Sequence, residues 1–207
     1  MKSMSRMWLH ARRSAVELIG DCRAIAATEF AVIVPLMLVM FFGTVEFSSA
    51  LAVYRDVTLV ARTLSDLTSQ STAVADSDLS DNFRAASYIL APYAATPMAA
   101  TISELYVDPT SLQARVQWSR SGTINSSGTV VLGTGLAVSS IVAIPSQLAV
   151  AGTYLIFSQM SYLYTPSVGY VMNINGVTLS DVAYTRPRQS ICVFYPTTPT
   201  PATCPTS

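Results

Sequence analysis

An apolar run near the N-terminus constrains the fold more than any other feature of the sequence. Residues 24–45 read AIAATEFAVIVPLMLVMFFGTV, and Glu29 is the only ionisable group among them. As a helix, this run is long enough to cross about 30 Å of hydrocarbon. Basic residues are concentrated before it, at Lys2, Arg6, Arg12, Arg13 and Arg23. Because positive charge marks the cytoplasmic flank of a membrane helix, the sequence predicts a cytoplasmic N-terminus and an exported remainder. A buried helix of a soluble protein is the alternative.

The length and charge of the remaining chain predict one modest domain. We divide the 207 residues into a cytoplasmic leader-like segment (1–24), a transmembrane helix (25–46), a helical stalk (47–70) and an exported α+β domain with a Pro-rich tail (71–207). Beyond Arg23 the chain carries seven basic and ten acidic residues. This balance predicts no basic face for nucleic acid.

Two local features frame the start of the apolar run. Residues 1–21 can form a short amphipathic helix, which is typical of a segment lying on anionic lipid. Glu29 lies within the run, where an unpaired carboxylate costs about 3 kcal/mol. Either Glu29 lies near the headgroups on the cytoplasmic side, or its partner is a cation that arises only after processing or assembly.

The residues around Glu29 resemble a known processing motif. The stretch AIAATEF, residues 24–30, is similar to the type IV prepilin motif of the tight-adherence branch, in which a small residue, normally Gly, is followed by four residues, Glu and an aromatic residue. The wider stretch over about residues 23–70 resembles the TadE/TadG-like pilus assembly proteins. Weaker similarity is present in the strings YLYTP and YTRPRQS near the end of the sequence.

The resemblance implies a structural role at the bacterial inner membrane, with the C-terminal domain in the periplasm or in a surface pilus. A prepilin peptidase would cut between Ala24 and Ile25, although Ala24 stands where the family usually has Gly. The new amine of Ile25 would be largely cationic at neutral pH. It would pair with Glu29 of a neighbouring pilin, with Phe30 as the motif's aromatic residue. The partners implied are the membrane, other pilins and pilus assembly proteins; no cofactor is implied.

Beyond the membrane, the pattern predicts that the same helix continues to about residue 70. Apolar positions recur at steps of three and four, and no Gly or Pro interrupts residues 47–70. The predicted core stripe consists of Phe47, Leu51, Tyr54, Val57, Ala61, Leu64 and Leu67 or Thr68. Pro35 lacks an amide hydrogen, so we expect a bend or loosened turn there. Small residues from Gly43 to Ala50 offer a thin face for another helix, or merely occur there.

A second helix is predicted after the polar stretch STAVADSDLSD. Ser77 or Asp78 would cap it, and its core face would carry Leu79, Phe83, Ala86, Ile89 and Leu90. The acids Asp76, Asp78 and Asp81 lack the Gly and Glu of a calcium-binding EF-hand loop, so helix capping is the favoured role.

From residue 101 onward the period changes to two, which predicts strands. We expect strands at residues 101–107 and 112–119, the second with Ala114, Val116 and Trp118 on one face. Residues 119–135 predict a mobile hairpin or loop, and residues 145–150 a short helical turn. The longest strand is expected at residues 154–164. Further strands are expected at residues 170–175, 177–179 and 191–195.

The chemistry-bearing residues favour a structural protein over an enzyme. Cys192 and Cys204 lie twelve positions apart on the exported side, which predicts a disulfide that pins the Pro-rich tail. The lone histidine, His10, precedes the apolar run, which excludes a His-dependent triad in the exported part. No nucleotide-binding or hydrolase motif is present. Glu104 with Asp108 or Asp181 is the one acid and base pair we considered, and scattered surface acids are the default interpretation.

Three functional hypotheses remain from the sequence. The first is a minor pilin or pseudopilin that assembles through residues 25–70. The second is an unprocessed, permanently anchored adaptor of the pilus assembly machine, which Ala24 favours. The third is a secreted domain cleaved after the small-x-small string at residues 50–52, against which Glu46 and the long leader argue. The mature N-terminus, at Ile25, Met1 or Val53 respectively, distinguishes the three.

Overall fold

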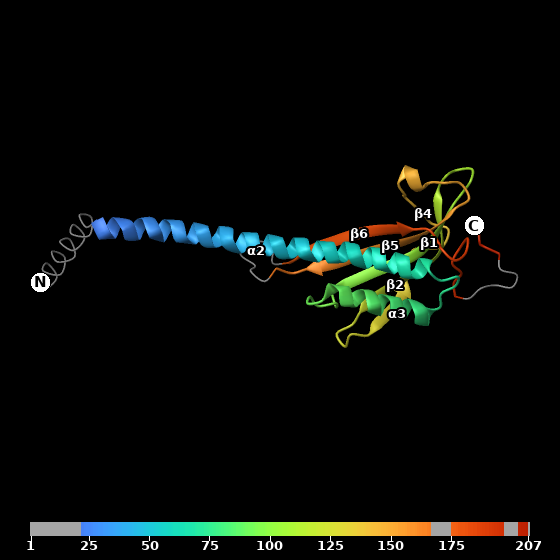
Figure 1. The fold of residues 1–207 in the computed structure, drawn as a ribbon, viewed down its shortest axis with the longest axis horizontal. Coiled ribbons are helices and arrows are strands. Elements are labelled where there is room, and N and C mark those ends of the chain that lie inside the picture. Colours follow the sequence, from blue (N-terminus) through green and yellow to red (C-terminus); the bar gives the residue numbers. More distant parts are fainter. Residues whose placement is uncertain (1–21, 167–174, 197–202, 207) are drawn as a thin grey trace, which may run out of the picture.

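One long helix projects from a small α+β domain (Figure 1). The computed structural model describes residues 22–166, 175–196 and 203–206. Helix α2 spans Cys22–Ser69 without interruption, which confirms the single helix expected through the membrane exit. It continues through Pro35, and a bend there stays a prediction. The predicted helix at residues 1–21 lies outside the described residues, as does nearly all of the predicted strand at 170–175.

The face of α2 that packs on the domain differs from the predicted stripe in its first half. The buried apolar residues are Val53, Val57, Val60, Ala61 and Leu64. Phe47, Leu51 and Tyr54 are 66%, 43% and 42% exposed, so their assignment to the core was wrong. At 100° per residue, Phe47 and Tyr54 lie about a quarter turn from the centre of the buried face, and Leu51 lies more than a third of a turn from it. The apolar period located a helix correctly, but the position of the sheet decides which side is covered.

Helix α3 spans Asp76–Ser87 and continues into the 3-10 turn η1 at Tyr88–Leu90. Its N-cap is Ala75 and not Ser77 or Asp78. Asp78 contributes from the first turn, where its Oδ2 accepts a hydrogen bond of 2.9 Å from the Ala75 amide. The predicted core residues are buried, apart from Ile89, which is half-buried.

The remaining elements form one antiparallel sheet. Its strand order is β3-β2-β1-β5-β6, with the short β4 paired to β2. The strands are β1 (Met98–Val107), β2 (Ala114–Ile124), β3 (Val130–Thr134), β4 (Ile141–Val142), β5 (Tyr154–Tyr164) and β6 (Val177–Thr185). The hairpin of β2 and β3 agrees with the Gly-rich hairpin expected at residues 119–135, and the turn η2 at Ser146–Leu148 agrees with the expected helical turn. β5 has the predicted bounds, β2 equals it in length, and β6 is longer than expected.

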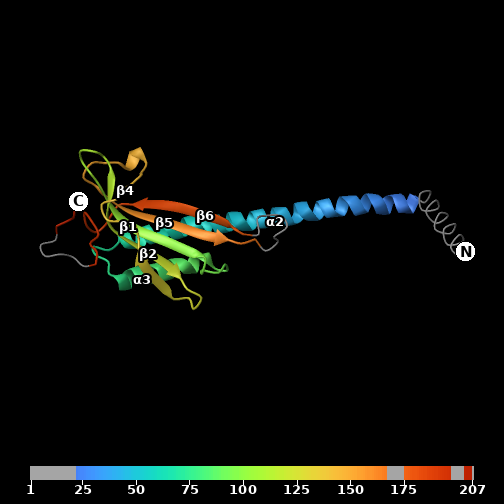
Figure 2. The same cartoon turned by 180° about the vertical axis from the view of Figure 1, so that it is seen from behind.

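Both helices cover the same face of the sheet. α2 packs on β5 and β6, and α3 packs near β2 and β3. Figure 2, drawn from behind, shows the sheet in front of the two helices. The main core lies between the helices and the sheet, and a smaller apolar cluster covers the opposite face. The α+β class predicted from the sequence is therefore confirmed.

A β-bulge corrects the predicted face of β2. Glu104 pairs with Trp118, whereas the next residue, Leu105, pairs with Val116, so Gln117 is the extra residue on β2. Ala114 and Val116 belong to the smaller cluster, but the bulge turns Trp118 into the main core on the helix side. The expectation of one shared face was therefore wrong.

The C-terminal segment adds no strand to the sheet. The strand expected at residues 191–195 is absent from this described segment, where Phe194 makes only an isolated parallel bridge to Ala73. Cys192 and Cys204 form a disulfide with a Cα–Cα distance of 5.9 Å, as predicted. The disulfide holds residues 203–206 at the end of the domain that lies farthest from the projecting part of α2 (Figures 1 and 2).

Candidate functional site

The projecting half of α2 is the largest feature that the domain leaves uncovered. No residue from position 26 to 45 is buried, and Glu29, Phe30 and Pro35 are all exposed. Ala24 and Ile25 lie in the first turn of the helix. Large apolar side chains point outward all around it, among them Val32, Ile33, Leu36, Met37, Leu38, Val39, Met40 and Phe41. A helix that is apolar on every side needs lipid or other helices around it.

The projecting segment has the dimensions of a membrane span. Residues 22–45 rise about 36 Å at 1.5 Å per residue, against about 30 Å of hydrocarbon. By length and composition, the helix from Ala26 onward can cross a membrane. Glu29 therefore lies close to the start of the span, where the sequence left two roles open: a position near the headgroups, or a charge partner from a neighbouring helix.

Glu46 marks the point where the helix meets the domain. It is the first buried residue of α2 after the projecting half, with 3% of its surface exposed. Its Oε2 accepts a hydrogen bond of 3.0 Å from the hydroxyl of Tyr164, at the end of β5. Burial, and then this hydrogen bond, raise the pKa of Tyr164 to about 12, so the phenol remains a donor at any physiological pH. The sequence identified Glu46 only as the end of the apolar run; its partner lies 118 positions away.

Polar contacts fix the second half of α2 to the sheet. The Thr58 hydroxyl donates to Asp181 Oδ2 at 2.6 Å, and Ser65 Oγ lies 2.5 Å from Thr185 Oγ1, both on β6. The hydroxyl of Ser158 on β5 donates to the carbonyl oxygen of Ala61. These contacts join the helix to two strands that are distant in sequence.

A second buried acid lies at the other end of the domain. Glu104 on β1 is fully buried, and its Oε1 accepts a hydrogen bond of 2.6 Å from the amide of Val193, next to the disulfide. Trp118 Nε1 donates to the Val193 carbonyl at 2.7 Å. The Tyr154 hydroxyl donates to the Pro205 carbonyl at 2.7 Å. The disulfide and these hydrogen bonds hold both sides of the C-terminal loop against the sheet.

The acids considered as an acid and base pair have separate structural partners. Asp108 accepts hydrogen bonds from the amides of Thr110 and Ser111 in the turn after β1, and these bonds lower its pKa. Asp181 holds Thr58.

The acids weighed against calcium binding also have local roles. Asp76 pairs with Arg120 at 2.7 Å and accepts a hydrogen bond from the Tyr195 hydroxyl. Asp78 accepts from the amide of the N-cap residue Ala75, and Asp81 lies 3.9 Å from Arg84. Within the described ranges, no group of three or more His, Cys, Asp or Glu side chains could hold a metal ion.

Comparison with known proteins connects the projecting helix to a family. Residues 24–65 match the family model described as TadE-like protein. The match begins at Ala24 and lies wholly within α2, so it covers the projecting half and most of the half that packs on the sheet. No curated protein and no solved structure matches the chain.

Proposed function

Because residues 24–65 are a TadE-like segment, of a family whose members are components associated with tight-adherence pili, we propose that the protein is a minor pilin or pseudopilin of such a pilus. One observation carries the proposal: the family match coincides with a helix whose first half is apolar, long enough to cross a membrane and uncovered by its own domain. Such a helix can lie in lipid before assembly and among other helices afterwards.

The charge distribution and the disulfide support the proposed orientation. The basic residues before Ala24 favour a cytoplasmic N-terminus. The domain would then lie in the periplasm, an oxidising compartment in which the Cys192–Cys204 disulfide is stable. The buried Glu46 would lie at the periplasmic surface of the inner membrane, next to Tyr164 at the end of β5.

Processing would convert the anchored precursor into an assembling subunit. A prepilin peptidase would cut between Ala24 and Ile25, at the start of the matched segment. The amine of Ile25 would then pair with Glu29 of a neighbouring subunit and fix the axial register between the helices. The exposed position of Glu29 on the projecting half supports this role, because the side chain is available to a neighbour.

We propose no enzymatic activity for the domain. Glu104, Asp108, Asp181 and Asp76 each hold a backbone amide or a side chain of the fold itself. These contacts account for the acids without any catalytic role.

The alternative is an unprocessed adaptor anchored in the inner membrane, which Ala24 in place of the usual Gly favours. A secreted domain cleaved after Ala52 has less support. Ala50 packs against the core and Val53 is fully buried within an unbroken helix, so this cleavage would remove the contact between Glu46 and Tyr164.

Mass spectrometry of the N-terminus, applied to membrane and sheared-pilus fractions, separates these functions. A minor pilin predicts recovery in sheared pili with Ile25 as the first residue. An adaptor predicts a membrane-bound protein that starts at Met1. A first residue of Val53 in the medium would refute both membrane functions.

A further inference from the structure

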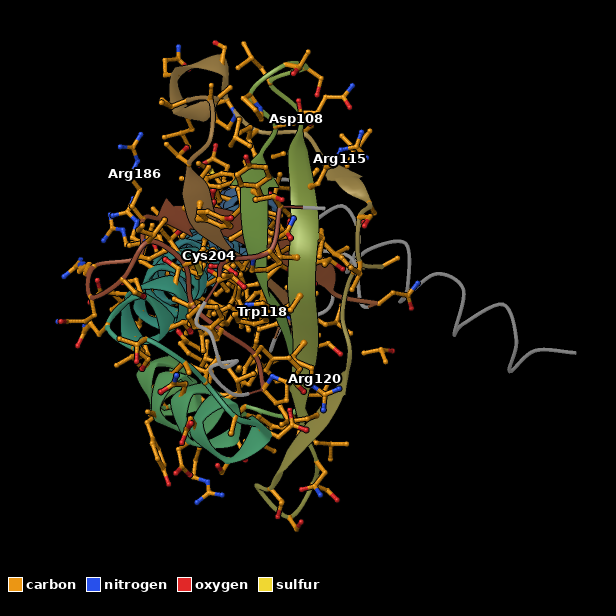
Figure 3. All side chains as sticks on the ribbon, turned by 90° about the vertical axis from the view of Figure 1, so that its right-hand side faces the viewer. Asp108, Arg115, Trp118, Arg120, Arg186 and Cys204 are labelled. Carbon is orange, nitrogen blue, oxygen red and sulfur yellow. A yellow bond between two sulfur atoms is a disulfide. The ribbon has the colours of Figure 1, made fainter. Side chains whose placement is uncertain are left out.

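A small cleft lies between strands β1 and β2 and the C-terminal residues 193–195, 203 and 205, at the end of the domain that faces away from the projecting helix. Its volume is about 220 Å³, several times the roughly 30 Å³ that one water molecule occupies in the liquid. It is lined by Glu104, Gln117, Trp118, Val193, Phe194, Tyr195, Thr203 and Pro205. Figure 3 looks onto this end and shows Trp118 and Cys204 near its centre.

One carboxyl oxygen of Glu104, in the wall of this cleft, has no hydrogen-bond donor in the described part of the chain. Its Oε1 is occupied by the Val193 amide, whereas Oε2 is buried and has no donor at hydrogen-bond distance among the described residues. The Trp118 indole also lies close to this carboxyl group, and with the Val193 amide it partly offsets the effect of burial on the pKa of Glu104. Leaving a buried carboxylate oxygen unsatisfied costs on the order of 1–3 kcal/mol or more. Burial raises the pKa of Glu104 to about 7, so the group is about half ionised at neutral pH. An acceptor of this kind points to a donor that comes from outside the domain.

No described lysine or arginine is among the residues that line the cleft. Arg120, the basic residue nearest this wall of the cleft, directs its guanidinium to Asp76 at 3.0 and 2.7 Å, and it stacks over the outer face of Tyr195. The chain's one lysine is Lys2, far from the domain in sequence. The other titratable groups close to Glu104 are the phenols of Tyr106 and Tyr154, and burial raises the pKa of Tyr154 to about 12. Among the described residues, nothing supplies the missing positive charge.

We propose that this cleft binds a primary alkylammonium group, the chemistry of a lysine side chain, through Glu104 Oε2. The rings of Trp118 and Tyr195, which stack on each other at 5.4 Å, line the cleft beside Glu104 and provide apolar surface for an alkyl chain. An ammonium needs a single acceptor atom, whereas a guanidinium is bound best by both oxygens of a carboxylate. Since Oε1 is already occupied, the geometry favours lysine over arginine. The inference does not depend on the proposed pilin function.

The test uses the full-length protein in detergent micelles. Trp8 and Trp118 are the chain's two tryptophans, so a Trp8→Phe background makes fluorescence report on the cleft alone. We expect n-butylammonium to produce a saturable change at pH 8. The neutral isostere n-butanol, and tetramethylammonium at the same ionic strength, should produce none, and n-butylguanidinium should bind at least tenfold more weakly. Tighter binding of N-acetyl-lysine amide than of putrescine would assign the site to a protein lysine, and the reverse order to a free diamine.

Glu104→Gln keeps the shape and removes the charge, so it should abolish the response. Asp108→Asn, which neutralises an exposed acid just beyond the same strand, should leave the response unchanged. In the protein with Glu104 intact, the affinity should fall about tenfold per pH unit below pH 7, which tests the proposal even if Glu104→Gln fails to fold. Equal responses to butylammonium and butanol, no saturable response to any amine, or unchanged binding by Glu104→Gln would overturn it.

Discussion

Two carboxyl groups are buried at opposite ends of the domain, and each joins segments far apart in sequence. Glu46 bonds to Tyr164 where the helix enters the domain, and Glu104 bonds to Val193 where the tail is held. Buried acids are costly unless they are hydrogen-bonded, so their partners should have measurable effects on stability. The first two predictions concern these residues.

Glu104 should make the domain less stable as the pH rises. Its pKa is raised from 4.5 to about 7, so its contribution to stability is fully present below pH 4.5 and is lost as the pH rises through 7. The loss between pH 4.5 and 8 should be about 3 kcal/mol. Glu104→Gln should remove this dependence and unfold at a higher temperature than the unsubstituted protein at pH 8.

Thermal unfolding followed by near-UV circular dichroism at pH 5 and pH 8 measures this effect. Asp108→Asn is the control, because the pKa of Asp108 is lowered and its titration falls below this window. The chain's one histidine, His10, lies outside the domain. If the unfolding temperature of Glu104→Gln still fell between pH 5 and pH 8, a group other than Glu104 would be responsible for the pH dependence of stability.

Tyr164→Phe should loosen the junction between helix and domain. The substitution removes a donor from the buried Glu46 carboxyl group, which should lower the free energy of unfolding by about 1–3 kcal/mol. Tyr184→Phe is the matched control, since its hydroxyl lies 3.5 Å from the Ala143 carbonyl in an exposed position. Urea unfolding of the two variants provides the comparison. Equal losses of stability would mean that the Glu46 contact contributes nothing specific.

At the scale of elements, α3 is held to the sheet by a close approach between a ring and a backbone. A Cβ added to Gly122 on β2 would lie 2.8 Å from carbon atoms of the Phe83 ring. Only glycine allows the ring to lie this close to the strand. The contact explains how a 12-residue helix with a single buried ring can cover the β2–β3 side of the sheet.

Gly122→Ala should therefore displace α3 and lower the free energy of unfolding by about 1–3 kcal/mol. Gly133→Ala serves as the control, because its Cβ would meet only the Oγ of Ser121, which can rotate away. Amide hydrogen exchange of residues 76–87, measured alongside stability, should speed up in the first variant and remain unchanged in the second. Unaltered exchange in Gly122→Ala would contradict this packing role.

The elements divide clearly into those that local pattern predicts and those that it does not. The length of α2 follows from the absence of breakers after Gly43, and β5 follows from alternation between residues 154 and 164. The exposed side of α2 at Phe47 could not be predicted, because it depends on where β5 and β6 lie. The bulge at Gln117 depends on pairing with β1, and the path of residues 191–195 depends on a disulfide and on Glu104.

The same distinction holds for the candidate sites. Glu29 and Phe30 could be identified from sequence because the motif that contains them is local. Glu46 and Glu104 could not, since their partners lie 118 and 89 positions away. An acid at the end of an apolar run and an acid inside an apolar strand were the only signals, and both also fit a surface position.

At the scale of the whole molecule, the apolar helix and the folded domain lie along one axis. The apolar half of α2 lies at one end, and the described residues around the Cys192–Cys204 disulfide lie at the other (Figure 1). The cleft that contains Glu104 lies beside these residues. Helix α2 runs from the projecting half into the core, so assembly through the helix would carry the domain outward with the tail end free. The central claim is that this assembly depends on Glu29.

Incorporation of Glu29→Gln into pili tests that claim most directly. The variant keeps the side-chain shape and removes the charge, so membrane insertion should be slightly easier. The exported domain should keep its protease resistance, because Glu29 lies outside the part of α2 that packs on the sheet. The measurement is the amount of this protein in sheared pili, together with its N-terminus. We predict that Glu29→Gln is cleaved before Ile25 but is lost from the pilus fraction. Recovery at the unsubstituted level, with cleavage intact, would contradict the account and indicate that Glu29 merely lies near the headgroups.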